Sequence, residues 1–214
     1  MANLRKFITF EGGEGTGKST QSELLAGRLR AYGYEVVTTR EPGGSPTAEY
    51  LRDIILSGKA KQFGAFAETT LFSAARIDHL RETIEPALKR DSWVICDRFL
   101  DSTRAYQGAL GNLDPRVLKA LERVVIGDMM PGLTFVLDLP PEEGLRRAQT
   151  RARGAAPDRF ESEEIDYHKA LRKAFLDIAS KEPDRIAVID GEATADRIAD
   201  QVWSEVTRRF GIDA

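Results

Sequence analysis

The sequence predicts an α/β protein built on a five-stranded parallel sheet with helices on both faces. Five short apolar runs, rich in β-branched and aromatic residues, alternate with longer stretches of helical periodicity. Gly, Pro or Asp bounds these runs. Such alternation is typical of parallel sheets, in which ligands lie beyond the carboxyl ends of the strands. We therefore expect functional residues directly after strands.

The elements follow from this pattern in chain order. The strands are expected at residues 4–10, 35–39, 93–96, 133–139 and 185–189. Runs of this length fit buried strands better than helices. The helices are expected at residues 19–32, 65–90, 115–126, 142–152, 163–180 and 194–210.

Size and composition indicate one globular domain over residues 1–214. Of the 214 residues, 42% are hydrophobic and 30% are charged, which is enough to build one substantial core. The net charge of -3 provides no broad positive field, so we expect no extended nucleic-acid partner. Cys96 is the only cysteine, which excludes an internal disulfide. Since no secretory leader or membrane-spanning apolar run is evident, we expect a cytoplasmic protein without a membrane partner.

The strongest motif is a phosphate-binding loop, GGEGTGKS, at residues 12–19. It fits G-x-x-x-x-G-K-[ST] and lies between the first strand and an amphipathic helix. Its glycines leave backbone N–H groups open to phosphate oxygens, and the helix N-terminus attracts negative charge. The sequence therefore predicts a three-layer P-loop NTPase fold that binds a magnesium-bound nucleotide.

The side chains of this loop have separate expected roles. Lys18 would place its ammonium on the phosphoryl group being transferred, and Ser19 would offer its hydroxyl to Mg²⁺. Thr20 would support the start of the helix. The residues expected at the ATP phosphates are Gly12, Gly13, Glu14, Gly15, Thr16, Gly17, Lys18, Ser19 and Thr20.

A carboxylate and a guanidinium follow the third strand. Asp97 would hold Mg²⁺ or its waters, and Arg98 would bridge the phosphates of two nucleotides as a fork of donors. A structural ion pair at the strand end is the alternative. Asp138 follows the fourth strand in the same way and competes for the magnesium role. Because two prolines come directly after the next residue, Asp138 has a second interpretation, as a strand end or helix cap.

Five strings in this order resemble the thymidylate kinase family, specifically its bacterial-type members. They are FEGGEGTGKSTQ (10–21), TREPGG (39–44), LFSAAR (71–76), DRF (97–99) and STRAYQG (102–108). The P-loop alone is generic, whereas the combination is specific and spans nearly the whole chain. The resemblance implies ATP as donor, thymidine monophosphate (dTMP) as acceptor and a homodimer. A kinase for dUMP, dCMP or a deoxynucleoside, and a regulatory nucleotide-binding module, are the alternatives.

Phe72 and Arg76 are the expected readers of the acceptor base. They are four residues apart in a helical segment and lie outside its apolar stripe, so both can face a ligand. The residues of that stripe are Ile77, Leu80, Ile84 and Leu88. A pyrimidine would stack on Phe72 while Arg76 donates to a carbonyl oxygen. Cytosine presents an amino group there instead, which favours thymine or uracil. A second core face with a surface arginine is the alternative.

The resemblance implies further acceptor contacts. Thr103 would face the thymine edge, and Tyr106 would pack against the sugar and exclude a 2'-hydroxyl. Gln107 would help to position the base or sugar, and Arg52 would contact the acceptor phosphate, with Arg40 a weaker candidate nearby. Glu14, an acidic residue inside a phosphate loop, would turn toward the 3'-hydroxyl of the acceptor. Each could instead be a solvated side chain.

Arginines around residues 154–157 predict a lid at approximately residues 147–160. Some relatives carry an arginine within the P-loop, where this chain has Glu14 and Thr16. Positive charge on the transferred phosphoryl group would therefore come from a segment that closes over ATP. Arg153 and Arg159 are the expected catalytic residues, and Arg147 the one that stacks on adenine. A basic, solvated helix face is the alternative.

Overall fold

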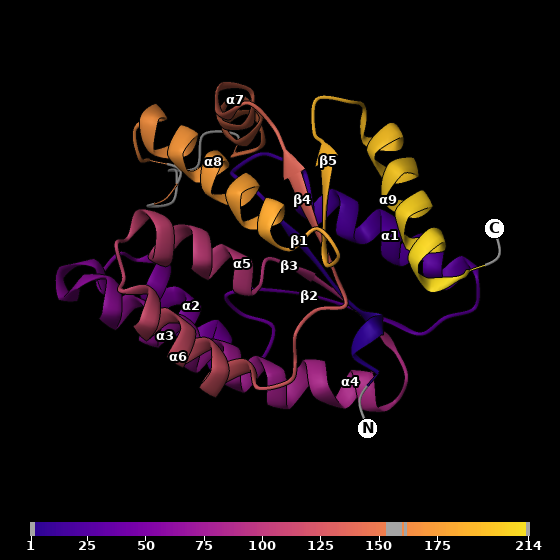
Figure 1. Cartoon of the computed structure of the whole chain (residues 1–214), viewed down its shortest axis with the longest axis horizontal. Coiled ribbons are helices and arrows are strands. Elements are labelled where there is room, and N and C mark those ends of the chain that lie inside the picture. The colour runs from indigo at the N-terminus through magenta and orange to yellow at the C-terminus, as the bar shows by residue number, and fades with distance from the viewer. Residues whose placement is uncertain (1–2, 153–159, 161, 213–214) are drawn as a thin grey trace.

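The computed structural model describes residues 3–152, 160 and 162–212. Its centre is a parallel sheet in the order β2-β3-β1-β4-β5, and Figure 1 shows helices on both sides of it. The predicted five-stranded parallel sheet is therefore confirmed. The strands are β1 (Phe7–Glu11), β2 (Val36–Arg40), β3 (Trp93–Asp97), β4 (Leu133–Asp138) and β5 (Ile186–Asp190).

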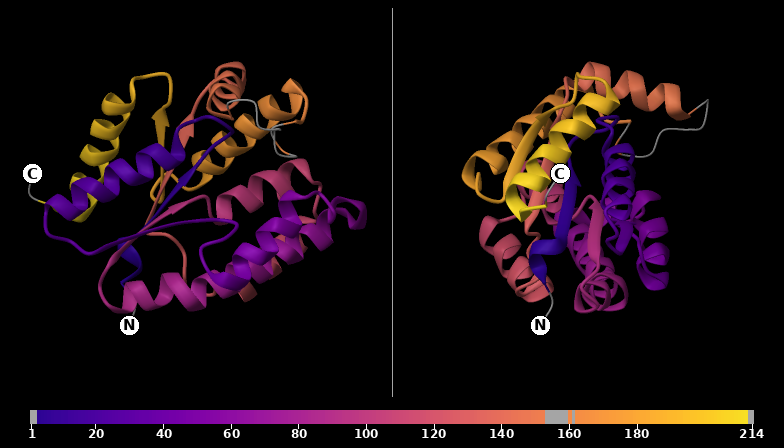
Figure 2. Two further views of the ribbon diagram at one scale, coloured as in Figure 1. Left: turned by 180° about the vertical axis from the view of Figure 1, so that it is seen from behind. Right: turned by 90° about the vertical axis from the view of Figure 1, so that its right-hand side faces the viewer.

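Helices form a layer on each face of the sheet. Helices α1 (Lys18–Ala31) and α9 (Ala195–Phe210) cover one face, while α4 (Glu85–Lys89) and α8 (Ile165–Lys181) contact the sheet from the other. Figure 2 shows the same layers from behind and from the side. The remaining helices are α2 (Pro46–Leu56), α3 (Gly64–His79), α5 (Leu100–Thr103), α6 (Pro115–Ile126) and α7 (Pro141–Ala152).

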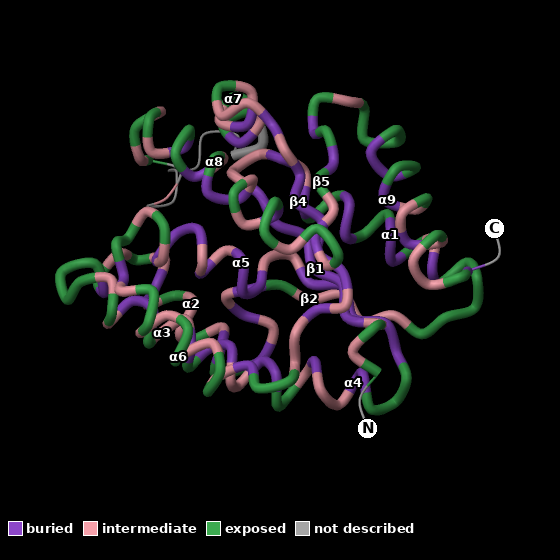
Figure 3. The backbone as a smooth tube through the Cα atoms, in the orientation of Figure 1, coloured by how far each residue is buried: buried purple, intermediate pink, exposed green. Residues whose placement is uncertain are grey.

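Alternating side chains of the strands explain the two layers. In β4, Phe135 and Leu137 pack in the cluster shared with α1 and α9, while Val136 between them packs with α8. Successive strand residues point to opposite faces, so a strand buried on both faces must be apolar throughout. Figure 3 shows buried residues concentrated along the strands and the sheet-facing sides of the helices.

The central position of β1 brings the candidate site together. Strand β1 pairs with β3 on one side and β4 on the other, and Phe10 is the partner of Asp97. The loop after β1 and the turn after β3 therefore leave the sheet side by side. Strands β2 and β3 lie on one side of β1, and β4 and β5 lie on the other. Such a switch point in the strand order is a common place for nucleotide binding in these folds.

Two predicted elements differ from the structure. The first strand begins at Phe7, because residues Leu4–Lys6 form a short 3₁₀ turn. The single helix expected at residues 65–90 is divided into α3, a π-helical segment (Leu80–Ile84) and α4. Pro86 has no N–H to donate and its ring clashes with the carbonyl four residues earlier, which explains a widened turn before it.

Two helical regions were not among the predicted elements. Helix α2 starts at Pro46, immediately after a Pro-Gly-Gly stretch that is typical of loops. Residues 100–110 form α5 and a π-helical continuation, Arg104–Leu110. Buried polar residues such as Asp101, Thr103 and Gln107 interrupt the apolar periodicity there, so a helix was hard to predict.

No helix in the described ranges is long and apolar enough to cross a membrane.

Candidate active site

The P-loop backbone requires glycine at particular positions. Gly12, Gly15 and Gly17 have φ values of 136°, 66° and 94°, a region that other residues rarely adopt. Gly15 also lies against the backbone of α7, because a Cβ atom there would be 1.9 Å from the carbonyl oxygen of Gly144. Conformation and space therefore both exclude a side chain at residue 15.

Lys18 lies folded over the loop. Its Nζ atom donates to the carbonyl oxygens of Gly13, at 2.6 Å, and Gly12, at 3.2 Å, and lies 3.3 Å from the hydroxyl of Thr16. Burial and then the neighbouring charge of Arg98 lower the pKa of Lys18 to about 8. A phosphate in the loop would raise that pKa again, so the ammonium suits an anionic ligand.

Ser19, in the first turn of α1, and Asp97, at the end of β3, are brought together. The Ser19 hydroxyl donates to Oδ2 of Asp97 over 2.5 Å. Hydroxyl and carboxylate oxygens are ligands that Mg²⁺ prefers, usually one or two from the protein together with phosphates and waters. In the described part of the chain no group of three or more His, Cys, Asp or Glu residues could hold a metal. The Ser19–Asp97 pair thus fits magnesium bound with a nucleotide.

Arg98 adopts an uncommon backbone conformation and points at the P-loop. Its φ is 66°, in the left-handed region that few residues other than glycine occupy. Its guanidinium donates to the carbonyl oxygen of Gly12 over 3.0 Å and to the carboxylate of Glu14 over 2.6 Å. Although burial lowers it, the pKa of Arg98 is raised overall by Tyr106, Glu14 and other acidic neighbours. Arg98 therefore stays charged next to the loop.

Glu14 turns away from the loop interior and toward the second half of the site. Besides Arg98, its carboxylate accepts a hydrogen bond from the Tyr106 hydroxyl over 3.0 Å. Burial raises its pKa, but the charges of Arg98 and Lys18 outweigh burial, and the pKa falls to about 2. Glu14 is therefore ionised and neutralised by its arginine partner.

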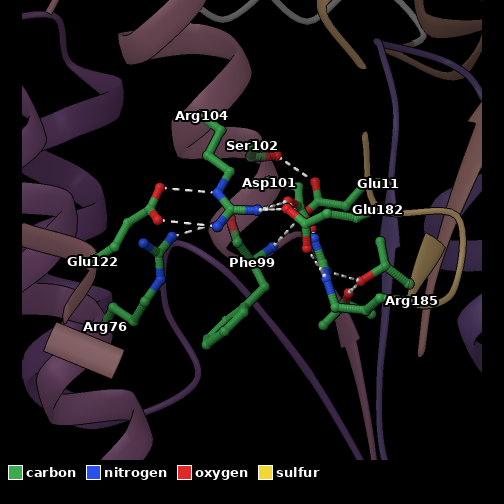
Figure 4. A network of polar contacts seen from close by, with 11 residues as sticks. Glu11, Arg76, Phe99, Asp101, Ser102, Arg104, Glu122, Glu182 and Arg185 are labelled. Atoms are coloured by element: carbon green, nitrogen blue, oxygen red, sulfur yellow. Dashed lines mark hydrogen bonds and ion pairs between the residues drawn. The ribbon is translucent and has the colours of Figure 1, made fainter. Parts of the chain in front are cut away.

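Glu11, which the sequence prediction overlooked, supports the turn that carries Arg98. Its two carboxylate oxygens accept from the backbone N–H of Phe99, at 2.8 Å, and from the hydroxyl of Ser102, at 2.6 Å, as Figure 4 shows. Burial and then the charge of Asp101 raise its pKa to about 7, against the lowering effect of these hydrogen bonds. The available signal was position, since Glu11 is a charged residue at the end of an otherwise apolar strand.

One cavity of about 230 Å³ lies between the P-loop and α2, α3 and α5. The structure brings every predicted acceptor residue to its wall, together with most of the phosphate loop. The predicted residues lining it are Glu14, Gly15, Thr16, Gly17, Lys18, Ser19, Arg40, Arg52, Phe72, Arg76, Asp97, Arg98, Thr103, Tyr106 and Gln107. Gly12 and Gly13 line a smaller cavity behind the loop, and Thr20 is exposed on α1.

Phe72 and Arg76 both face this cavity, and the apolar stripe of the helix faces the core. Arg76 is almost fully buried: it has polar partners, and its guanidinium lies over the ring of the core residue Phe99 at 5.0 Å. Its guanidinium contacts the hydroxyl of Thr103 over 3.0 Å. Leu80 and Ile84, from the predicted stripe, pack in the core. The predicted separation of the two faces is confirmed.

Aromatic rings close the wall beside the P-loop. The ring of Tyr106 meets Phe160 edge to face, with 5.1 Å between ring centroids, and Arg98 lies over the Tyr106 ring at 5.4 Å. Burial raises the pKa of the Tyr106 hydroxyl well above its ordinary value. Arg52 donates to the carbonyl oxygen of Pro42 over 2.6 Å and borders the same cavity.

The predicted lid residues are only partly described. Arg147 on α7 is paired with Glu143 over 2.7 Å and donates to the carbonyl oxygen of Gly191 over 3.1 Å, outside the cavity wall. Arg153 and Arg159 lie outside the described residues, as does the side chain of Arg151.

Asp138, the competing candidate for magnesium, is occupied by an ion pair. Both of its carboxylate oxygens accept from Arg172, at 2.6 and 2.8 Å. This bidentate contact with α8 is a structural role for a carboxylate at a strand end. Asp97 therefore remains the better candidate for a magnesium ligand.

Two further groups of buried polar and charged residues were missed. In the first group, Glu41 contacts both His79 and Arg76. Asp101 is held by Arg104 and Arg185 in the network drawn in Figure 4. His79 lies three residues after Arg76, which places both on one helix face and was the available signal. The second group joins residues 84 positions apart, and no local pattern predicts such a contact.

Comparison with known proteins identifies the family. The thymidylate kinase family model matches residues 10–202. Thymidylate kinases of Bradyrhizobium sp. (strain ORS 278) and Rhodopseudomonas palustris (strain TIE-1) are 57% and 56% identical over 205 and 206 residues, covering 96% of this chain and 91% and 90% of theirs. The crystal structure of thymidylate kinase from Ehrlichia chaffeensis matches with a TM-score of 0.74 and 35% identity, covering 94% of this chain and 97% of that one. The chain belongs to the thymidylate kinase family.

Proposed function

We propose that the chain transfers the γ-phosphoryl group of ATP to dTMP, giving ADP and dTDP for dTTP synthesis. The observation that carries this proposal is the cavity of about 230 Å³ described above. A phosphate loop with Lys18 and Arg98 forms one end, and an aromatic ring with a buried arginine, Phe72 and Arg76, lies on its wall. Its volume of about 230 Å³ suits one nucleotide-sized acceptor placed against the donor phosphates.

The donor end acts through positioning and charge. Backbone N–H groups of the P-loop hold the ATP phosphates, and Lys18 neutralises charge on the phosphoryl group as it moves. Arg98, held by the carbonyl oxygen of Gly12 and the carboxylate of Glu14, lies between the donor loop and the acceptor pocket. Transfer is in line and needs no covalent intermediate.

Magnesium is the proposed cofactor, with Ser19 and Asp97 as its protein contacts. Bound there, Mg²⁺ would neutralise phosphate charge and orient the donor. The fit of two hard oxygen atoms at 2.5 Å separation supports the assignment.

The acceptor end reads the base, the sugar and the phosphate separately. Thymine stacks on Phe72 and accepts from Arg76, with Thr103 and Gln107 at its edge. Tyr106 packs against the sugar and excludes a ribose 2'-hydroxyl. Glu14 orients the 3'-hydroxyl, and Arg52 contacts the acceptor phosphate. Support comes from their common place on the wall of one cavity.

A lid supplies the remaining positive charge. We assign residues 147–160 to it, with Arg153 and Arg159 at the transferred phosphoryl group and Arg147 at adenine. The contact between Arg147 and the carbonyl oxygen of Gly191, directly after β5, places Arg147 at the carboxyl-end edge of the sheet, where ligands of such folds bind.

The proposal extends to the assembly and the compartment. We take residues 1–214 as one kinase domain that acts as a cytoplasmic homodimer without nucleic-acid partners. Exposed apolar side chains on neighbouring helices, Phe66 on α3 and Val124 on α6, would be covered in such a dimer. Light scattering measures the dimer directly.

An acceptor panel tests the reaction. In a coupled assay for ADP release with Mg-ATP, dTMP should be used far more efficiently than dCMP or dAMP, and dUMP should fall between them. Equal rates with all acceptors would rule out pyrimidine selection. ATP hydrolysis that no acceptor stimulates would indicate the regulatory alternative.

The donor loop is tested by Lys18→Ala. Turnover should be lost while circular dichroism and thermal melting show a folded protein. Retention of full activity would remove the assigned role of the P-loop lysine.

A further inference from the structure

We propose that Glu41 and His79 are positioning residues that hold Arg76 rigid and thereby set the discrimination between thymine and cytosine. The inference rests on the proposed dTMP kinase function and assigns a role to two residues outside it. Neither residue would touch the reacting atoms. Both would act through the arginine that reads the base.

The first contact is a buried ion pair in the wall of the acceptor cavity. Nε of Arg76 donates to Oε2 of Glu41 over 2.7 Å, and each side chain exposes only 4% of its surface. A charge-assisted bond in such a place is stronger than a neutral one, and removing one partner leaves an unpaired buried charge. The backbone N–H of Glu41 also donates to the carbonyl oxygen of Asp97 over 2.9 Å, which fixes Glu41 to the end of β3.

The second contact uses one terminal nitrogen of the same guanidinium. Nη2 of Arg76 donates to the carbonyl oxygen of Phe99 over 3.1 Å and to the hydroxyl of Thr103 over 3.0 Å. Phe99 also donates its backbone N–H to Glu11, so both main-chain polar groups of this residue are hydrogen-bonded (Figure 4). Among the described residues these contacts engage Nε and Nη2, which leaves Nη1 as the donor for a ligand in the cavity.

His79 fixes the other oxygen of Glu41. Its Nδ1 atom lies 3.1 Å from Oε1 of Glu41, and its Nε2 atom lies 2.7 Å from the hydroxyl of Thr39. When the hydroxyl donates to Nε2, the proton of the neutral ring is on Nδ1 and points at the carboxylate. Both oxygens of Glu41 are then occupied, and the carboxylate cannot rotate away from Arg76.

The backbone of Gly44 packs closely against the contact between His79 and Thr39. A Cβ atom at Gly44 would lie 2.3 Å from Nε2 of His79 and 2.4 Å from the hydroxyl oxygen of Thr39. Residue 44 also has a φ of 85°, which favours glycine. The glycine thus permits the main chain to approach His79 and Thr39 closely.

A rigid Arg76 has a consequence for specificity. Thymine offers a carbonyl oxygen to Nη1, whereas cytosine offers an amino group, and two facing donors leave both unpaired. A flexible arginine would turn aside and admit water, which would reduce the penalty for cytosine. Loosening the support should therefore impair the use of dTMP more than that of dCMP.

Two variants of His79 test whether its Nδ1 atom, rather than the ring as a whole, supports Glu41. The amide nitrogen of Asn reaches about as far as Nδ1, and that of Gln about as far as Nε2. His79→Asn should therefore keep a donor for Glu41, while His79→Gln should lose it. The readout is kcat/KM for dTMP divided by kcat/KM for dCMP. Thr83→Ala is the matched control, because it removes a 2.7 Å contact between the same loop and helix segment without touching Glu41.

We expect His79→Gln to lower this ratio about tenfold, chiefly by raising KM for dTMP. The ratio in His79→Asn and in Thr83→Ala should stay within about threefold of the wild-type value. On a free-energy scale this is less than half of the tenfold effect expected for His79→Gln. An unchanged ratio in His79→Gln, or an equal loss in both histidine variants or in the control, would overturn the proposal. If His79→Gln does not fold, Glu41→Gln decides, since it keeps the volume and removes the charge. It should also lower the ratio about tenfold, and an unchanged ratio would overturn the proposal.

Failure of the proposed function has a different signature. Wild-type protein would then use dTMP and dCMP equally, before any variant is made.

Discussion

Oε1 of Glu14 lies 2.6 Å from the guanidinium of Arg98, so the acidic side chain within the P-loop is neutralised by the residue that follows β3. The two groups come from the ends of neighbouring strands, β1 and β3. Their pairing resolves the conflict of a carboxylate in a loop built for phosphate. Both residues of the pair also line the cavity next to the P-loop.

Glu14→Ala should lower kcat/KM for dTMP about 10- to 100-fold, because a buried charged partner of Arg98 is removed. Steady-state kinetics at saturating Mg-ATP measures this change. Glu205→Gln, which alters ion pairs on α9, serves as the control and should leave activity unchanged. A Glu14→Ala enzyme with wild-type efficiency would show that the pair is dispensable.

Glu11 should make the free energy of unfolding depend on pH. Its pKa is raised from an ordinary value of 4.5 to about 7, so between these values the folded protein binds a proton that the unfolded chain has lost. This contribution to stability is present below about pH 4.5 and is lost as pH rises through about 7. It amounts to at most about 3 kcal/mol.

Urea unfolding of the wild type and of Glu11→Gln at several pH values measures that contribution. The wild type should lose stability relative to the variant between about pH 4.5 and pH 7.5. A constant difference across this range would show that Glu11 does not titrate there.

Gly15→Ala should destabilise the protein severely, by about 3 kcal/mol or more. The new Cβ atom would clash with the carbonyl oxygen of Gly144, and residue 15 has a left-handed backbone conformation that disfavours alanine. Gly27→Ala is the matched substitution, because residue 27 lies exposed inside α1 with open space around it. It should stabilise the protein by about 0.5–1 kcal/mol. Thermal melting compares the two, and similar melting temperatures would contradict the close contact at residue 15.

Arg153→Ala and Arg159→Ala should lower kcat more than they raise KM, because charge is needed mainly as the phosphoryl group moves. Arg116→Ala, at an exposed position on α6, should be kinetically silent. The lid assignment is wrong if both lid variants keep the wild-type kcat.

Local patterns predicted the five strands, most of the helices and the phosphate loop. The P-loop is a continuous segment whose glycines, lysine and flanking elements are all visible in the sequence. Asp97 and Arg98 were predictable because parallel strands end at one edge of the sheet. Phe72 and Arg76 were predictable because four residues bring two side chains to one helix face.

The buried polar contacts were not predictable in the same way. Glu41 meets Arg76 across 35 positions, and Asp101 meets Arg185 across 84. Such pairs depend on how helices pack, which single-segment periodicity does not encode. The π-helical turns at residues 80–84 and 104–110 also depart from the regular 3.6-residue period on which helix prediction rests.

Gly15 and Gly144 bring two stretches of main chain into direct contact. With no side chain between them to absorb a displacement, a tilt of the first turn of α7 would be passed on directly to the P-loop, where we propose that ATP binds. Substitutions that shift this turn should therefore alter nucleotide affinity even when they lie far from any phosphate. Substitutions at the start of α7 would thus change the position of the P-loop without altering any residue of the loop itself.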